Sequence, residues 1–121
     1  MYIINKREVG KTYESKAVDY LISNGFVILE RNYRNRFGEI NIIAKKDRTI
    51  TFIEVKYRRN RSFGDALEAV DHRKQIRISR VAAAYLMSKI INMSTPCSFD
   101  VIVIYGDGVI NHVKNAFEFR M

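Results

Sequence analysis

Two stretches in the first half of the chain alternate apolar and polar positions and are rich in residues that favour strands. They cover residues 39–44 and 50–56 and are dominated by Ile, Val, Phe and Thr. The four residues between them, 45–48, are all charged. Two strands joined by a short polar turn form a β-hairpin. The pattern therefore predicts a hairpin with its turn near Lys46 and Asp47, and the rest of the chain should be arranged around it.

The two faces of this hairpin differ in polarity. Side chains two positions apart in a strand share a face, so Glu39 and Asn41 should lie on one side, as should Glu54 and Lys56. Antiparallel pairing across the predicted turn brings Asn41 close to Glu54. The opposite side should face the core, and its residues are Ile40, Ile42, Ile53 and Val55.

The other periodic segments predict two helices and three further strands. The order helix, three strands, helix, two strands is typical of an α+β fold, an α/β/α sandwich with a mixed central sheet between helices. In chain order, we expect a helix over Lys11–Asn24, a strand over Phe26–Tyr33, the hairpin, a helix over Leu67–Ile91 capped by Asp65, and strands over Phe99–Tyr105 and Val109–Val113.

The composition indicates one compact domain over residues 1–121. The chain is 47% hydrophobic and 28% charged, close to globular averages. Its one cysteine, Cys97, excludes an internal disulfide and suits a reducing compartment. We expect a cytoplasmic protein without a membrane partner, because no secretory h-region and no run of membrane-spanning length are present. His72 and His112 are expected at the surface.

The net charge of +8 is concentrated in three short segments, residues 31–36, 56–61 and 72–80. They hold 11 of the 21 Lys and Arg residues and none of the 13 Asp and Glu residues. The remainder, with 10 basic and 13 acidic residues, carries a net charge of −3. Such clusters are expected where a polyphosphate backbone crosses a protein surface, although solvated basic loops have the same composition.

Eight basic side chains in these clusters are candidates for contacts to nucleic-acid phosphates. Lys74 lies on the apolar stripe of the second helix, where its ammonium could reach either a pocket or the solvent. The eight candidates are Arg34, Arg36, Arg58, Arg59, Arg61, Arg73, Lys74 and Arg77.

Carboxylates near the hairpin are candidate metal ligands. Glu54 and Lys56 occupy a strongly apolar strand, where charges need partners, and carboxylate oxygens suit Mg²⁺. Glu14 shares the apolar face of the first helix with Ala17 and Leu21. Either it serves the same site, or it favours the helix N-terminus through the helix dipole.

A set of motifs spread over residues 10–105 resembles the YraN-like family of predicted endonucleases, within the PD-(D/E)XK, or restriction-endonuclease-like, superfamily. The resemblance implies an αβββαβ core, Mg²⁺ or Mn²⁺ as cofactor, and a site of Glu14, Asn41, Glu54 and Lys56, with Asn41 and Glu54 on the metal. The motifs are Glu14, Gly25-Phe26, Arg31-Asn32-Tyr33-Arg34, Gly38-Glu39-Ile40-Asn41, Ile53-Glu54-Val55-Lys56-Tyr57-Arg58 and Lys74.

One departure from the family pattern limits this expectation. The family has Asp where this chain has Asn41, and an amide brings no negative charge to a metal. Three functions therefore remain open: a metal-dependent nuclease, a non-catalytic nucleic-acid-binding module, and a structural or protein-interaction protein. The expected partner is nucleic acid, with DNA favoured over RNA. A homodimer is a further possibility that the sequence does not decide.

Overall fold

The computed structural model describes residues 6–60, 70–92 and 94–120, with side chains from Thr12 onward. Its elements follow the predicted order of helix, three strands, helix and two strands. This confirms the expected α+β class and the αβββαβ core, which a further strand extends. The elements are α1 (Lys6–Ser23), β1 (Val27–Asn35), β2 (Gly38–Lys46), β3 (Thr49–Arg58), α2 (His72–Ser88), β4 (Cys97–Tyr105) and β5 (Ile110–Phe117).

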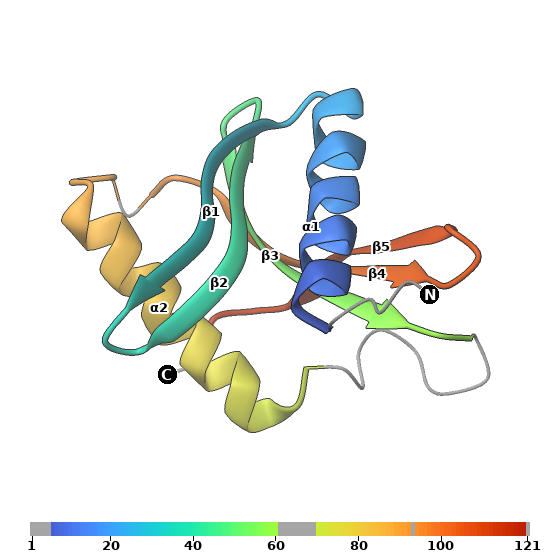
Figure 1. Ribbon diagram of the computed structural model, residues 1–121. Coiled ribbons are helices and arrows are strands. Elements are labelled where there is room, and N and C mark those ends of the chain that lie inside the picture. Colours follow the sequence, from blue (N-terminus) through green and yellow to red (C-terminus); the bar gives the residue numbers. More distant parts are fainter. Residues whose placement is uncertain (1–5, 61–69, 93, 121) are drawn as a thin grey trace.

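The five strands form one mixed sheet in the order β1-β2-β3-β4-β5 (Figure 1). Neighbouring strands are antiparallel except β3 and β4, which are parallel and are connected through α2. The β2–β3 hairpin has its polar turn at Asp47 and Arg48, one residue later than predicted, because Lys46 pairs with Thr49. β3 and β4 lie inside the sheet, which explains why most of their residues are buried.

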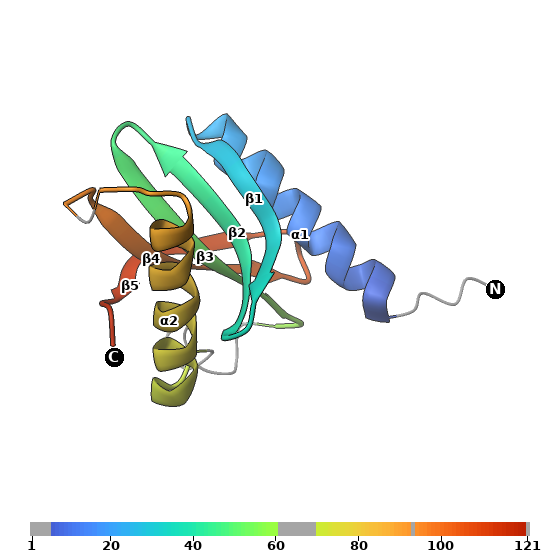
Figure 2. The same cartoon turned by 90° about the vertical axis from the view of Figure 1, so that its left-hand side faces the viewer.

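The two helices cover opposite faces of this sheet (Figure 2). α1 packs through Ala17, Val18 and Leu21 on one face, and α2 packs through Val81 and Tyr85 on the other. Each helix therefore buries its own apolar stripe, and the sheet supplies both cores. The sheet residues under α1 are Ile42, Ala44, Ile53, Ile102 and Ile104, and those under α2 are Ile40, Ile43, Ile50, Phe52, Phe99, Val101 and Val103.

Both helix starts differ from the sequence prediction. α1 begins at Lys6, before the predicted Lys11. α2 begins at His72 because Asp71 has an extended backbone, with φ −72° and ψ 173°, and its side chain accepts the backbone N–H of Lys74. That contact is an N-cap. The predicted cap Asp65 lies outside the described residues.

The predicted alternation along β2 is wrong at one point. Ile40 packs in the core under α2, whereas Ile42 packs in the core under α1. On the paired strand, Asn32 lies between their partners and has φ 51°, in the left-handed region. Such a residue interrupts the regular pleat of its strand. Asn41 occupies the corresponding position on β2.

His112 is buried, not at the surface as predicted. Its side chain is 5% exposed, with Nε2 2.6 Å from Asp100 Oδ2 and Nδ1 2.9 Å from the Tyr20 hydroxyl. Pairing of β5 with β4 brings His112 beside Asp100, and α1 covers it with Tyr20. No helix among the described residues has the length and apolar character needed to cross a membrane.

Candidate functional site

The strands β2 and β3 part where the predicted polar residues begin. Their pairing ends at Ile42 and Ile53. Beyond that pair, Asn41 Oδ1 accepts the backbone N–H of Val55 at 2.8 Å. A side-chain oxygen thus satisfies a backbone donor that would otherwise need a strand partner. The two strands can separate here without leaving the Val55 N–H unpaired.

A cavity of about 210 Å³ lies at this fork. Residues from β2, β3 and α2 meet in it, which confirms that Glu39 and Asn41 share a side of the hairpin and that Asn41 lies close to Glu54. We call it the Glu54 cavity, and its lining residues are Glu39, Asn41, Glu54, Lys74, Arg77 and Ile78.

Two ammonium groups share one oxygen of Glu54. Glu54 Oε1 lies 2.9 Å from Lys74 Nζ and 3.4 Å from Lys56 Nζ, and the Glu54 side chain is only 10% exposed. Of the two alternatives for Lys74, the ammonium in a pocket is therefore confirmed. A largely buried carboxylate needs partners of this kind, and here it has two.

The pKa values of Lys56 and Lys74 are shifted in opposite directions. Burial lowers the pKa of Lys56, the nearby Lys74 lowers it further, and Glu54 only partly opposes them. Burial also acts to lower the pKa of Lys74, but its hydrogen bonds to Glu54 and to Lys56 and the charge of Glu54 outweigh burial, so the pKa of Lys74 is raised. Lys56 is therefore the more easily deprotonated member of the pair.

The oxygen atoms that could ligate a metal in the Glu54 cavity do not suit a bound divalent cation. Glu54 Oε1 already contacts two ammonium groups, and the Asn41 oxygen already accepts the Val55 N–H. Asn41 brings no negative charge, and its amide nitrogen cannot ligate a metal. Across the described residues, no group of three or more His, Cys, Asp or Glu side chains is placed to hold a metal ion.

The charges around this cavity suit an anion better. Lys56, Lys74 and Arg77 bring three positive charges to it. Glu54 and Glu39 bring two negative charges, and Glu39 is paired with Arg34, 2.8 Å away. The balance is positive, and the ammonium groups can donate to further oxygens.

The structure does not bring Glu14 into the lining of the Glu54 cavity. Glu14 belongs to α1, on the other face of the sheet from α2. It lies well beyond the first turn of α1, so the helix-dipole explanation for it is wrong. Its Oε1 is buried and has no hydrogen-bond partner among the described residues, and Arg31 Nε is 4.0 Å away. The role of Glu14 in the site remains a prediction.

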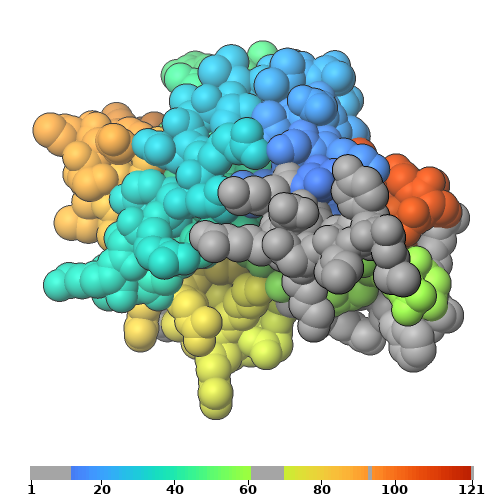
Figure 3. Space-filling model, viewed as in Figure 1, coloured from blue at the N-terminus to red at the C-terminus, as the bar shows by residue number. Residues whose placement is uncertain are grey.

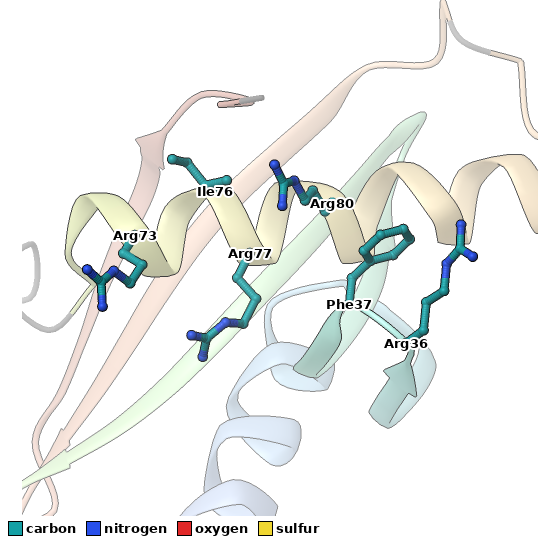
Figure 4. Close-up of a pocket in the computed structure, with 6 residues that line it drawn as sticks. All are labelled: Arg36, Phe37, Arg73, Ile76, Arg77 and Arg80. Carbon is teal, nitrogen blue, oxygen red and sulfur yellow. The ribbon is translucent and has the colours of Figure 1, made fainter.

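A second cavity, of about 380 Å³, collects arginines from two elements (Figure 4). Arg73, Arg77 and Arg80 extend from α2 together with Ile76, and Arg36 and Phe37 come from the turn between β1 and β2. Sequence reasoning did not select Arg80. The spacing of Arg73, Arg77 and Arg80 was the available signal, because positions i, i+4 and i+7 share a helix face.

Gly38 brings the start of β2 against α2. Its φ is 147°, and a Cβ at this position would lie 3.0 Å from Arg77 Cδ and 3.4 Å from Val81 Cγ2. Glycine thus permits both the backbone conformation and the close approach. Figure 3 shows the result, with side chains of the β1–β2 region beside the first half of α2 on one face.

The other predicted basic residues lie elsewhere. Arg58 and Arg59 are at the end of β3, where the Arg58 carbonyl accepts the N–H of Gly106 at 3.0 Å. Neither lines the two cavities described above. Arg61 lies outside the described residues. Contacts of these three arginines to nucleic acid remain predictions.

Comparison with known proteins identifies relatives over most of the chain. Residues 13–104 match the model of a family described as uncharacterised protein family UPF0102. The chain is 44% identical to a UPF0102 protein of Lachnoclostridium phytofermentans, with 95% of this chain and 97% of that protein covered. It is 46% identical to a UPF0102 protein of Clostridioides difficile, with 94% and 100% covered. A UPF0102 protein of Fusobacterium nucleatum subsp. nucleatum is 52% identical over 71% of this chain and 72% of that protein.

Proposed function

The chain belongs to the uncharacterised protein family UPF0102, and we propose that it binds nucleic acid by holding a backbone phosphate at the Glu54 cavity. The observation that carries this proposal is the sharing of Glu54 Oε1 by Lys56 and Lys74. The carboxylate positions both ammonium groups but can neutralise only one of them. A phosphate oxygen is a suitable partner for the remaining positive charge.

The surroundings support the same ligand. Arg77 lines the Glu54 cavity and also the arginine-lined cavity beside it, so positive charge continues along α2. Lys and Arg contacts to phosphate supply affinity without sequence preference. The resemblance to the PD-(D/E)XK nucleases, in which Glu54 and Lys56 correspond to the Glu-x-Lys motif, also favours a nucleic-acid partner. The αβββαβ order is compatible with such a core.

Metal-dependent phosphodiester hydrolysis is the second candidate. Two observations favour it. One is the lowered pKa of Lys56, which is typical of residues that exchange protons. The other is the buried oxygen of Glu14, which has no hydrogen-bond partner in the part of the chain that the structure describes. The donor set described above opposes a bound Mg²⁺ or Mn²⁺. We therefore rank binding without hydrolysis first.

The salt dependence of binding tests the proposal. Anisotropy of a fluorescent oligonucleotide should report an affinity that falls linearly with salt concentration on logarithmic axes. Lys74→Gln should lower the affinity and reduce that slope by about one, because one phosphate contact is lost. Lys16→Gln removes the same charge from α1, on the other face of the sheet, and should leave the slope unchanged.

Two results would overturn the proposal. One is the absence of salt-dependent binding to single-stranded and duplex oligonucleotides, which would favour a protein-interaction role. The other is an equal loss of slope in Lys74→Gln and Lys16→Gln, which would mean that only net charge matters. Metal-dependent cleavage that disappears in Glu54→Gln and Lys56→Gln would move hydrolysis to first place.

A further inference from the structure

A third cavity continues the arginine-lined one along α2. It has a volume of about 360 Å³ and shares Arg36, Phe37 and Arg80 with that cavity. The two together form a single groove between α2 and the β1–β2 turn, which we call the α2 groove. One end of it is cationic. The other end is apolar, and its additional lining residues are Ala83, Ala84 and Met87.

The cationic end gathers the guanidinium groups of four arginines. Among the residues that the structure describes, no carboxylate lies within ion-pairing distance of Arg36, Arg73, Arg77 or Arg80. Arg36 instead lies over the Phe37 ring, with its Cζ 4.7 Å from the ring centroid. This cation–π contact restricts the guanidinium without cancelling its charge. The end is therefore suited to anionic ligands with several acceptor oxygens.

The apolar end is open to solvent. Met87 is 72% exposed, although it stands on a helix whose opposite face is fully packed. Ala83 and Ala84 have small side chains, so they leave room between the Met87 and Phe37 side chains. A polarisable thioether beside an aromatic ring and small apolar side chains is a favourable surface for a flat, apolar group.

A ligand that fills the whole groove must join phosphates to a flat apolar group, and a nucleotide with an unpaired base has both. We propose that the α2 groove binds single-stranded nucleic acid, with backbone phosphates on the arginines and one base in the apolar end. This inference rests on the proposed function and deepens it. A duplex keeps its bases stacked and paired, so it offers no base to this end.

Two features favour this ligand over a protein. Arg77 lines both the α2 groove and the Glu54 cavity, so one nucleic-acid strand could contact both. A second copy of this chain would instead bring its own cationic groove against the first. Like charges facing each other disfavour such a contact.

The test compares a single-stranded oligonucleotide, the same strand in a duplex, and single strands with one abasic position moved along the sequence. We expect the single strand to bind more tightly than the duplex, and at least one abasic position to weaken binding. Met87→Gln, which keeps the length of the side chain but makes it polar, should weaken single-strand binding by about fivefold or more, since stacking contributes about 1–3 kcal/mol per base. It should leave duplex binding unchanged.

Ile90→Gln is the matched control. Ile90 is apolar and 93% exposed, lies just beyond α2, and does not line the groove. Equal or tighter binding of the duplex, no effect of any abasic position, or equal effects of Met87→Gln and Ile90→Gln would each overturn the inference. Salt-dependent binding would still stand in those cases, so the proposed function would survive. A Met87-dependent change in the elution volume of the free protein would assign the groove to a second copy and would also overturn the inference.

Discussion

Asn41 and Val55 are joined across the fork of the sheet by a hydrogen bond of 2.8 Å from the Val55 backbone N–H to the Asn41 side-chain oxygen. This bond fixes the orientation of the Asn41 amide, whose oxygen points toward the Val55 backbone. In Asn41→Asp, one carboxylate oxygen can keep the bond to Val55 while the other adds a charged acceptor. We expect Mg²⁺ or Mn²⁺ binding to tighten, as measured by isothermal titration calorimetry.

Asn41→Leu provides the comparison for that experiment. It has a similar volume but no acceptor, so the Val55 N–H is left unpaired in a partly buried position. The free energy of unfolding should fall by about 1–3 kcal/mol. Unchanged metal binding in Asn41→Asp, together with an undiminished stability of Asn41→Leu, would show that the Asn41 side chain does not point into the fork.

The pKa shifts of the two lysines predict a pH dependence of stability. Because the pKa of Lys56 is lowered from 10.5, the unfolded chain binds more protons at Lys56 than the folded chain does at pH values between the lowered pKa and 10.5. The contribution of Lys56 to stability should therefore rise with pH across that window. Lys74 acts in the opposite sense above 10.5, because its raised pKa makes its contribution fall as the pH rises.

Lys56→Met should remove the Lys56 contribution to this rise, as measured by the difference between its stability and that of the parent chain in urea unfolding at a series of pH values below 10.5. Lys74→Met should reduce it, since the Lys74 ammonium is one of the causes that lower the pKa of Lys56. Equal pH dependence of stability in the parent chain and in Lys56→Met below pH 10.5 would contradict the direction of the Lys56 pKa shift, because Cys97 and Tyr85, whose pKa values are raised, change stability with pH in both chains.

The buried His112 predicts a large difference between the two histidines. His112→Leu removes the partner of Asp100 Oδ2 and of the Tyr20 hydroxyl, and it should destabilise the fold by about 1–3 kcal/mol. His72→Leu changes an exposed residue at the start of α2 and should alter stability by no more than about 0.5 kcal/mol. Equal effects in urea unfolding would place His112 at the surface after all.

The cap of α2 predicts a linked change in stability and binding. Asp71→Ala removes the acceptor for the Lys74 backbone N–H and should cost about 1 kcal/mol. It should also weaken nucleic-acid binding, because the first turn of α2 positions Lys74 at Glu54. Asp19→Ala removes the same charge from an exposed position on α1 and should change neither measurement by a comparable amount. Retained stability in Asp71→Ala would mean that α2 begins elsewhere.

The hairpin was predictable because strand periodicity and a run of charged residues act locally. The same rules placed Asn41 near Glu54, which the structure confirms. The start of α2 was missed because helix periodicity continues N-terminally past Asp71, and only the cap geometry ends the helix. The burial of His112 depends on the β4–β5 pairing and on Tyr20 from α1, and a single-sequence pattern carries no information about such distant partners.

In the candidate site, too, local features could be predicted from the sequence, whereas contacts between distant segments could not. Residue types identified Glu54 and Lys56, but the sequence could not show that Lys74 would take the same carboxylate oxygen, because that contact depends on how α2 lies over β3. The α2 groove was also beyond prediction. It forms where Phe37 from one hairpin meets Met87 from a helix 50 residues later.

The two-residue turn at Asp47 and Arg48 sets the register of the β2–β3 hairpin. Lys46 faces Thr49 across it, and each later pair follows in step up to Ile42 and Ile53. One additional residue in this turn would shift one arm relative to the other and exchange its inward and outward faces. Asn41 would then point away from Glu54. The length of this turn therefore maintains the hydrogen bond between the Asn41 side chain and the Val55 backbone of β3.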